Sequence, residues 1–129
     1  MKDTIPNRCI YFDVDETLIQ WEFEPDFVVT HEHQMKLPED FILIDDIRFR
    51  IHKPHIMRLM QHHNTGDCVV VWSAGGINWA RRVIEALAIQ DYVNVVLGKP
   101  DFFYDDENIP CLKGKRMYLN IDTGKFERG

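Results

Sequence analysis

An apolar run near the start of the sequence ends abruptly in acid, because Asp13 and Asp15 follow directly after residues 9–12. Carboxylates held close together in one pocket repel one another, and one of them takes up a proton unless a cation neutralises the charge. Oxygen ligands with several retained waters favour Mg²⁺. A spacing of two residues lets one turn present both carboxylates to the same pocket, and the pair therefore predicts half of a magnesium site.

A hydroxyl group and a glycine-rich turn follow a later apolar run, at residues 68–72. Ser73 and the backbone N–H groups of residues 74–76 are typical of a site that binds a tetrahedral anion, and Lys99 adds a positive charge. A carboxylate beside a metal and a bound phosphoryl group can act as a nucleophile and form an aspartyl-phosphate. A second carboxylate two residues later can protonate the leaving oxygen and then activate water.

A parallel sheet is the support that we expect for these groups. Four short apolar runs are rich in β-branched or aromatic residues and lack polar alternation, as in strands buried on both faces: residues 9–12, 68–72, 93–97 and 102–104. Apolar residues at helical spacing lie between them, at residues 54–63 and 77–89. This order predicts right-handed crossovers and an α/β fold, a Rossmann-like three-layer α/β/α sandwich with a mostly parallel sheet.

Ligands bind such a sheet at the carboxyl ends of its strands. Polar residues follow every predicted strand, and the last strand is followed by the pair Asp105 and Asp106. We therefore expect the carboxylates, the hydroxyl group and the lysine to converge on one edge of the sheet.

Residues 21–51 depart from this pattern and predict a β-hairpin flap inserted after the first strand. Two extended runs flank Asp45 and Asp46, which are a plausible hairpin turn. Arg48 and Arg50 share a face of the second run; they either contact a substrate phosphate or form the solvent face of the hairpin. The tail, residues 113–129, predicts another hairpin that turns at residues 122–124.

Composition limits the classes of protein to be considered. The 129 residues fit a single domain, residues 1–129. The net charge of −6 argues against non-specific nucleic-acid binding and suits a site that collects cations. The three cysteines are odd in number and lack CxxC spacing, which argues against disulfides or a zinc site and suits a reducing cytosol. Without a signal peptide or an apolar run long enough to span a bilayer, we expect a cytoplasmic protein with no membrane partner.

The segments YFDVDETL, VVVWS, GKP and FFYDD resemble the four ordered motifs of the haloacid dehalogenase (HAD) superfamily of phosphohydrolases. The resemblance spans residues 9–106, and an acid at the second position of the first motif resembles the members that handle phosphate. The resemblance implies a Mg²⁺-dependent phosphomonoesterase with an aspartyl-phosphate intermediate. The gaps between the motifs cannot hold a full second domain, so the chain resembles the capless members with an open site.

The resemblance also implies a role for each matched residue. The catalytic set comprises Asp13 as nucleophile, Asp15 as general acid/base, Ser73 and Lys99. The substrate-binding set comprises Thr17, Ser73, Ala74, Gly75 and Lys99, and Thr17 would also help to hold the turn of the first motif. The Mg²⁺-binding set comprises Asp13, Asp15 through its backbone carbonyl, Asp105 and Asp106.

Several alternatives stay open from the sequence. Asp101 or Asp122 could take the metal-binding role expected of Asp105 and Asp106. The substrate is phosphorylated, but nothing distinguishes a small molecule from a phosphoprotein, and nucleic acid enters only as a substrate end. The oligomeric state is not predicted. We expect Trp72 and Trp79 to pack in the core or at the rim of the pocket, and His62 and His63 to lie at the surface.

Three other functions compete with the phosphatase. A phosphotransferase would pass the aspartyl-phosphate to an acceptor other than water. A two-component receiver domain uses similar residues, but its phospho-accepting Asp ends a middle strand before the Ser/Thr, whereas here the middle strand ends in Ser73. A non-catalytic relative would use the fold for binding alone, which the intact pair Asp13 and Asp15 argues against.

Overall fold

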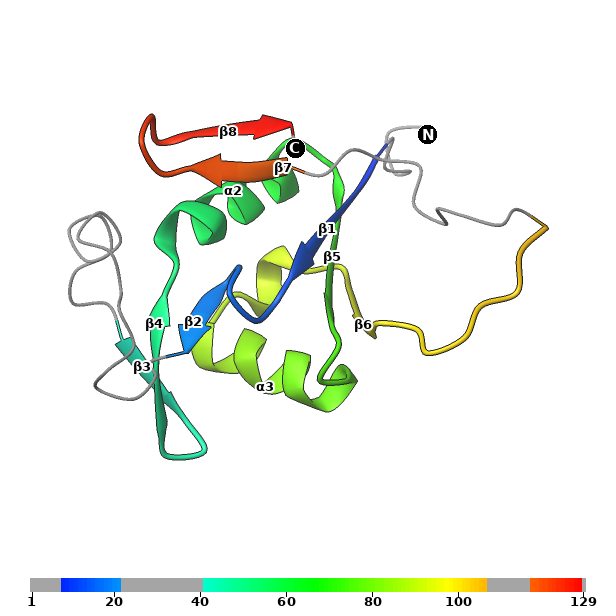
Figure 1. The fold of residues 1–129 in the computed structure, drawn as a ribbon, viewed down its shortest axis with the longest axis horizontal. Coiled ribbons are helices and arrows are strands. Elements are labelled where there is room, and N and C mark those ends of the chain that lie inside the picture. The colour runs from blue at the N-terminus through cyan, green and yellow to red at the C-terminus, as the bar shows by residue number, and fades with distance from the viewer. Residues whose placement is uncertain (1–7, 22–40, 107–116, 129) are drawn as a thin grey trace.

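The computed structural model describes residues 8–21, 41–106 and 117–128 (Figure 1). In chain order, the elements are β1 (Cys9–Asp13), β2 (Ile19–Trp21), β3 (Phe41–Ile44), β4 (Ile47–Ile51), α2 (Lys53–Asn64), β5 (Cys68–Ser73), α3 (Ile77–Leu87), the 3-10 helix η2 (Gln90–Tyr92), β6 (Val95–Gly98), β7 (Met117–Asn120) and β8 (Lys125–Arg128). None of the helices in this described part is long and apolar enough to cross a membrane.

A parallel three-stranded sheet in the order β1-β5-β6 forms the centre of the α/β fold. The register places Asp13 opposite Trp72, and Ser73 opposite Gly98. The strands predicted at residues 9–12 and 68–72 are therefore confirmed, and the one predicted at residues 93–97 is confirmed from Val95. Because the strands run parallel and nearly in register, β1, β5 and β6 all end at the same edge of the sheet.

Helices α2 and α3 cover one face of this sheet. The two crossovers step in the same direction across the sheet, and right-handed connections then put both helices on the same side. Leu59 of α2 and Val83 of α3 share one core cluster with Val69 and Val71 of β5. On the opposite face, Tyr11 is 43% exposed. The described residues therefore form two layers, and the third layer of the predicted sandwich is not seen among them.

The flap is an antiparallel sheet in the order β2-β4-β3. Asp45 and Asp46 make its turn with φ angles of 54° and 66°, which is the left-handed backbone that a type I′ hairpin turn requires. Phe49 of β4 is fully buried and joins the core. The predicted hairpin around Asp45 and Asp46 is confirmed, and the pairing extends to β2, which begins at Ile19; residues 22–40 of the predicted flap lie outside the described residues.

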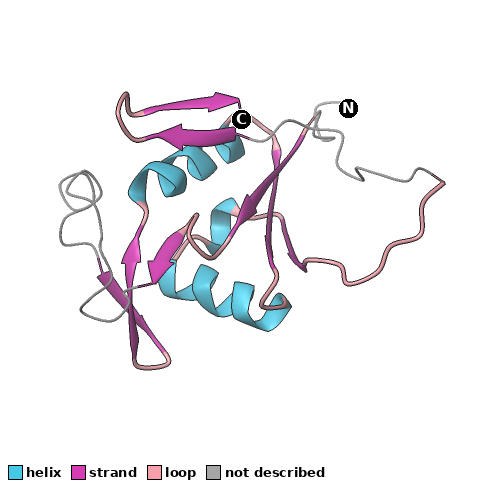
Figure 2. Cartoon of the chain, viewed as in Figure 1, coloured by secondary structure: helices cyan, strands magenta, loops and turns pink. Residues whose placement is uncertain are grey.

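The predicted hairpin in the tail is confirmed as β7 and β8, with Asn120 paired to Lys125 and Gly124 at a φ of 72° in the turn. Figure 2 shows this hairpin running alongside α2. Phe126 makes the contact, because its ring centroid lies 5.1 Å from that of His55 on α2.

The strand predicted at residues 102–104 is not formed in this structure. The segment after β6 has no strand assignment, and Phe102 and Tyr104 are 87% and 100% exposed. Apolar and aromatic composition favours an extended backbone, but a strand also needs a neighbouring edge with which to exchange hydrogen bonds. Pro100, which cannot donate a backbone hydrogen bond, directly follows Lys99 and interrupts the chain between β6 and this segment.

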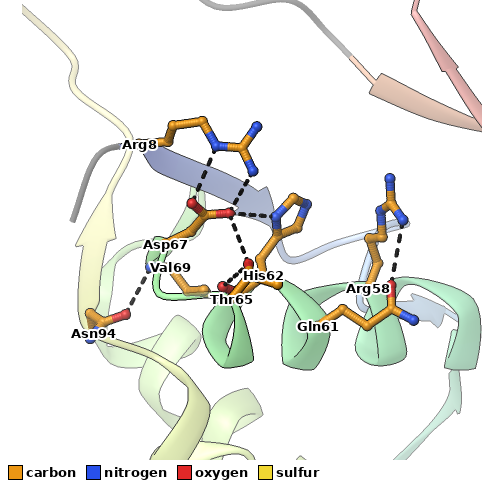
Figure 3. Close-up of polar contacts among 8 residues, drawn as sticks. All are labelled: Arg8, Arg58, Gln61, His62, Thr65, Asp67, Val69 and Asn94. Atoms are coloured by element: carbon orange, nitrogen blue, oxygen red, sulfur yellow. Dashed lines mark hydrogen bonds and ion pairs between the residues drawn. The ribbon is translucent and has the colours of Figure 1, made fainter. Parts of the chain in front are cut away.

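A polar cluster joins the amino ends of β1 and β5 (Figure 3). Arg8 donates from Nε and Nη2 to the two carboxylate oxygens of Asp67, at 3.2 and 2.8 Å, and His62 Nδ1 lies 2.9 Å from Asp67 Oδ2. The hydrogen bonds from Arg8 are the main reason why the pKa of Asp67 is lowered. Asp67 is nearly buried, and the cluster satisfies its charge at the amino ends of the strands. Asp13, Ser73 and Lys99 lie at the opposite, carboxyl ends.

Candidate functional site

The predicted chemical groups at the ends of β1, β5 and β6 meet at the carboxyl edge of the parallel sheet. Lys99 Nζ lies 3.1 Å from Asp13 Oδ1, and both side chains are 36% exposed. The backbone N–H of Lys99 donates to the Ser73 carbonyl at 2.9 Å, which ties the end of β6 to the end of β5. The structure thus places a carboxylate and an ammonium group in contact, where solvent and a ligand can reach them.

The turn after β1 is held by its backbone and by two buried side chains. The Val14 carbonyl accepts hydrogen bonds from the N–H groups of Thr17 and Leu18, at 3.2 and 2.9 Å. The side chains of Val14 and Leu18 are fully buried, so the alternate residues, Asp13 and Asp15, are left at the surface of the turn. Thr17 Oγ1 donates to Asp13 Oδ2 at 3.4 Å, a contact that fits the proposed role of Thr17 in this turn.

Asp15 is held by two tryptophans. Trp21 Nε1 and Trp79 Nε1 both donate to Asp15 Oδ1, at 3.0 and 3.1 Å. The first indole comes from β2 of the flap and the second from the first turn of α3. Both rings pack against Phe49, with centroid separations of 4.7 Å for Trp21 and 5.7 Å for Trp79.

Sequence reasoning assigned Trp79 to packing alone and gave Trp21 no role. The structure confirms that Trp79 packs, and it adds the bond to Asp15 that the sequence analysis missed. One signal was present in the sequence. An indole N–H is a donor that needs an acceptor when the ring is buried, and a carboxylate was already expected at the same edge of the sheet.

The Ser73 hydroxyl organises the turn between β5 and α3. Ser73 is fully buried, and its Oγ accepts the Gly75 N–H at 2.9 Å. A Cβ atom at Gly75 would lie 3.0 Å from Cδ1 of Trp79, so a side chain there would displace the indole. Gly76 follows with a φ of 102°, which favours glycine, and α3 begins immediately afterwards. The hydroxyl of Ser73 and the N–H of Gly75 are therefore bonded to each other in this structure, while Ala74 is exposed at the tip of the turn.

The structure does not bring Asp105 and Asp106 to Asp13 and Asp15. Both acids are exposed at the end of the segment that follows β6, and Figure 1 shows this segment leaving the parallel sheet. Within residues 8–21, 41–106 and 117–128, no three His, Cys, Asp or Glu side chains are grouped so as to hold a metal ion. The predicted strand that would have returned these acids to the site is not formed, which accounts for their position.

The other open candidates also lie apart from the site. Asp101 is exposed in the same segment, and Asp122 sits in the turn of the C-terminal hairpin. Arg48 and Arg50 stack over the ring of Phe41, at 4.6 and 5.3 Å from its centroid. Neighbours in a strand face opposite ways, so these arginines point away from the side on which Phe49 meets the tryptophans.

Asp13 and Asp15 provide oxygen ligands that fit a Mg²⁺ ion. Mg²⁺ keeps several of its waters and is commonly bound through one or two carboxylates together with phosphate oxygens of a substrate. The Asp13 carboxylate, whose side chain is 36% exposed, and the backbone carbonyl of Asp15 would hold the ion together with substrate oxygens and retained waters, without a second protein carboxylate.

A comparison of the chain with protein-family models, with curated proteins and with solved structures finds no match in any of the three. The function therefore has to be inferred from the geometry of the site.

Proposed function

We propose that this protein is a Mg²⁺-dependent phosphomonoesterase that works through an aspartyl-phosphate on Asp13. The observation that supports it most is the 3.1 Å contact between Asp13 Oδ1 and Lys99 Nζ at the carboxyl edge of a parallel sheet. Asp15 stands two residues further along the same turn, as the mechanism requires. The proposal includes a capless fold of the HAD type, a three-layer sandwich in its finer description, and a cytoplasmic location.

The first half of the reaction moves a phosphoryl group onto the protein. An oxygen of Asp13 attacks phosphorus, and the bond from phosphorus to the leaving oxygen breaks. Asp15 gives its proton to that oxygen, so that the product leaves as a neutral alcohol. Lys99 offsets the negative charge that Asp13 and the phosphoryl group bring together. Bound Mg²⁺ would supply further positive charge to the phosphoryl oxygens and orient them.

The second half regenerates Asp13. Asp15, now ionised, takes a proton from a water molecule while the water oxygen attacks phosphorus. The bond between phosphorus and the Asp13 oxygen breaks, inorganic phosphate leaves, and Asp15 is again protonated for the next cycle. Each atom and proton is then accounted for by Asp13, Asp15, the ester and one water.

The exposure of Asp13 also favours a second candidate, a phosphotransferase. A side chain that is 36% exposed can be reached by an alcohol acceptor as well as by water. The same open edge suits large phosphorylated substrates, including a phosphoprotein or the end of a nucleic acid. Product analysis in the presence of an added alcohol, such as glycerol, separates the two: a hydrolase yields inorganic phosphate, and a transferase yields glycerol phosphate.

Phosphate release from a panel of phosphorylated substrates tests the proposal. The panel includes aryl and alkyl phosphates, nucleotides, phosphopeptides and oligonucleotides with terminal phosphates, each with and without Mg²⁺. We expect Mg²⁺-dependent release by the wild-type protein and loss of it in Asp13→Asn. A wild-type protein that releases no phosphate from any of them contradicts the proposal.

A further inference from the structure

We infer that Trp21 and Trp79 are positioning residues that decide which oxygen of Asp15 exchanges protons with the substrate and with water. This inference rests on the proposed function, because it concerns the group that serves there as general acid and base. It goes further because it assigns a function to the flap and to the first turn of α3, which supply the two indoles that orient Asp15.

The geometry concerns a single oxygen atom. Both indole N–H groups end on Asp15 Oδ1, at 3.0 and 3.1 Å, and neither is bonded to Oδ2. A carboxylate oxygen has two lone-pair positions, so two donors occupy both of them. When Asp15 is protonated, its proton must therefore reside on Oδ2.

In the proposed reaction, Oδ2 is therefore the oxygen of Asp15 that gives and takes the proton. In the first half, the O–H bond on Oδ2 breaks and its proton goes to the leaving oxygen. In the second half, Oδ2 accepts a proton from the attacking water. An indole N–H donates but cannot accept, so the tryptophans orient Asp15 without competing for the proton that it transfers.

The surroundings hold the two indoles in place. Phe49 is fully buried and packs edge-on against Trp21, with ring planes at 76°. The absence of a side chain at Gly75 makes room for Trp79, whose Cδ1 would lie 3.0 Å from a Cβ there. The two donors come from different elements, Trp21 from β2 and Trp79 from α3, and their ring centroids lie 6.1 Å apart, so Asp15 links the flap to the first turn of α3.

The variants Trp21→Phe and Trp79→Phe each remove one N–H and keep an aromatic ring. The test compares an alkyl phosphate, whose leaving oxygen needs a proton, with nitrophenyl phosphate, whose leaving group departs without one. We expect kcat/KM for the alkyl phosphate to fall about tenfold in each variant, the equivalent of one hydrogen bond to a charged group. We expect kcat/KM for nitrophenyl phosphate to change by less than about twofold, because this constant covers only the steps up to the loss of the leaving group.

Trp72→Phe is the matched control, since it also removes an indole N–H and keeps an aromatic ring, while Trp72 packs against Tyr11 and is not one of the two donors to Asp15. We expect it to change kcat/KM for the two substrates by the same factor. Equal losses on both substrates in the tryptophan variants would show a merely structural role and overturn the inference while leaving the proposed function standing. A wild-type protein that cleaves neither substrate would instead contradict the proposed function itself.

Nuclear magnetic resonance of the indole N–H groups gives a readout that does not depend on activity. In Asp15→Ala we expect the Nε1–H signals of Trp21 and Trp79 to shift and to exchange faster with deuterated water. The signal of Trp72, whose ring packs against Tyr11 at 4.9 Å, is the internal reference. Unchanged signals of Trp21 and Trp79 would show that they do not bond to Asp15, and would overturn the inference.

Discussion

Lys99 Nζ lies 3.1 Å from Asp13 Oδ1, although Asp13 ends β1 and Lys99 follows β6, the two outer strands of the parallel sheet. The contact follows from the register, because Asp13 lies opposite Trp72 and the adjoining residue Ser73 lies opposite Gly98. The ammonium group of Lys99 also lies 5.4 Å from the centroid of the Trp72 ring, and Trp72 belongs to the middle strand, β5. A parallel sheet thus turns three separate strand ends into one charged site.

Replacing Lys99 with methionine should impair catalysis far more than stability. The ion pair is partly exposed, and exposed pairs contribute only about 0–1 kcal/mol to stability. The charge on phosphate is spread over oxygens that Lys99 would face, so we expect kcat/KM for an aryl phosphate to fall about a hundredfold or more. Lys125→Met, on the exposed start of β8, is the matched control and should keep full activity. Equal activity in both variants would exclude Lys99 from the site.

Replacing Gly75 with alanine should reproduce the effect of Trp79→Phe. The new methyl group would lie 3.0 Å from Cδ1 of Trp79 and 3.3 Å from Oγ of Ser73, so the indole that bonds to Asp15 must shift by a few tenths of an ångström to admit it. We expect a selective loss of kcat/KM on alkyl phosphates. Gly66→Ala is the control, since it introduces strain at a φ of 90° without any atom within 4 Å, and it should lower stability while keeping the ratio of the two substrates. An unchanged ratio in Gly75→Ala would count against the coupling.

The partly buried His55 should make stability depend on pH between about 4 and 6.5. Burial is the main cause that lowers its pKa to about 4, and a hydrogen bond to the Thr17 backbone opposes the shift. Because His55 titrates near its usual pKa of about 6.5 when unfolded, the unfolded state binds more protons in this window, and stability falls as the pH is lowered through it.

The size of the effect can be measured by urea unfolding at several pH values. After allowance for screening by solvent, we expect a loss of about 2 kcal/mol in the free energy of unfolding across this window. In His55→Phe the dependence should flatten. His55 Nδ1 lies 3.0 Å from Nδ1 of His52, so His52→Phe is the companion variant that shows which ring carries the effect. A wild-type curve without slope in this window would contradict the prediction.

Asp67 should stabilise the fold at neutral pH and lose that contribution in acid. Its pKa is lowered chiefly by hydrogen bonds from Arg8, with a further contribution from His62. A carboxyl group with a lowered folded pKa stabilises above its unfolded pKa of about 3.9 and loses this stabilisation as the pH falls through the folded value. We expect Asp67→Asn to cost about 1–3 kcal/mol at pH 7, with the two unfolding curves converging as the pH falls below the unfolded pKa of about 3.9.

The exposed Asp91 on η2 provides the control for this experiment. Asp91→Asn has the same change of charge away from the cluster and should alter the unfolding free energy by less than about 0.5 kcal/mol. Curves for Asp67→Asn and the wild type that stay parallel down to acid pH would show that the cluster of Figure 3 does not carry the effect.

Local patterns were sufficient to predict much of the fold. The apolar run that ends in Asp13 and the valine run that ends in Ser73 each form a strand of the expected kind. Asp45 and Asp46 form the predicted hairpin turn, because short acidic side chains tolerate left-handed backbone. Each of these predictions depends on residues that are close in sequence.

Long-range pairing was harder to predict. Residues 102–104 have the composition of a strand but pair with no strand among the described residues, and the acids after them are not grouped with Asp13. The bonds from Trp21 and Trp79 to Asp15 depend on how the flap meets α3, which no local pattern encodes. His62 was expected at the surface and is instead mostly buried against Asp67, because the turn after α2 brings the Asp67 N–H to the His62 carbonyl, at 3.1 Å.

The identity of the residue that carries the phosphoryl group is the most direct test of the proposed function. After a brief reaction with a turnover substrate and Mg²⁺, the protein is quenched, the acyl phosphate is trapped by borohydride reduction, and peptides are sequenced by mass spectrometry. We predict that Asp13 is the reduced residue and carries the borohydride label. The amount of labelled Asp13 should increase in Asp15→Asn, in which hydrolysis of the acyl phosphate is slow, and Asp13→Asn should carry no label. A protein that turns over substrate with the label elsewhere, or with no label even in Asp15→Asn, would contradict it.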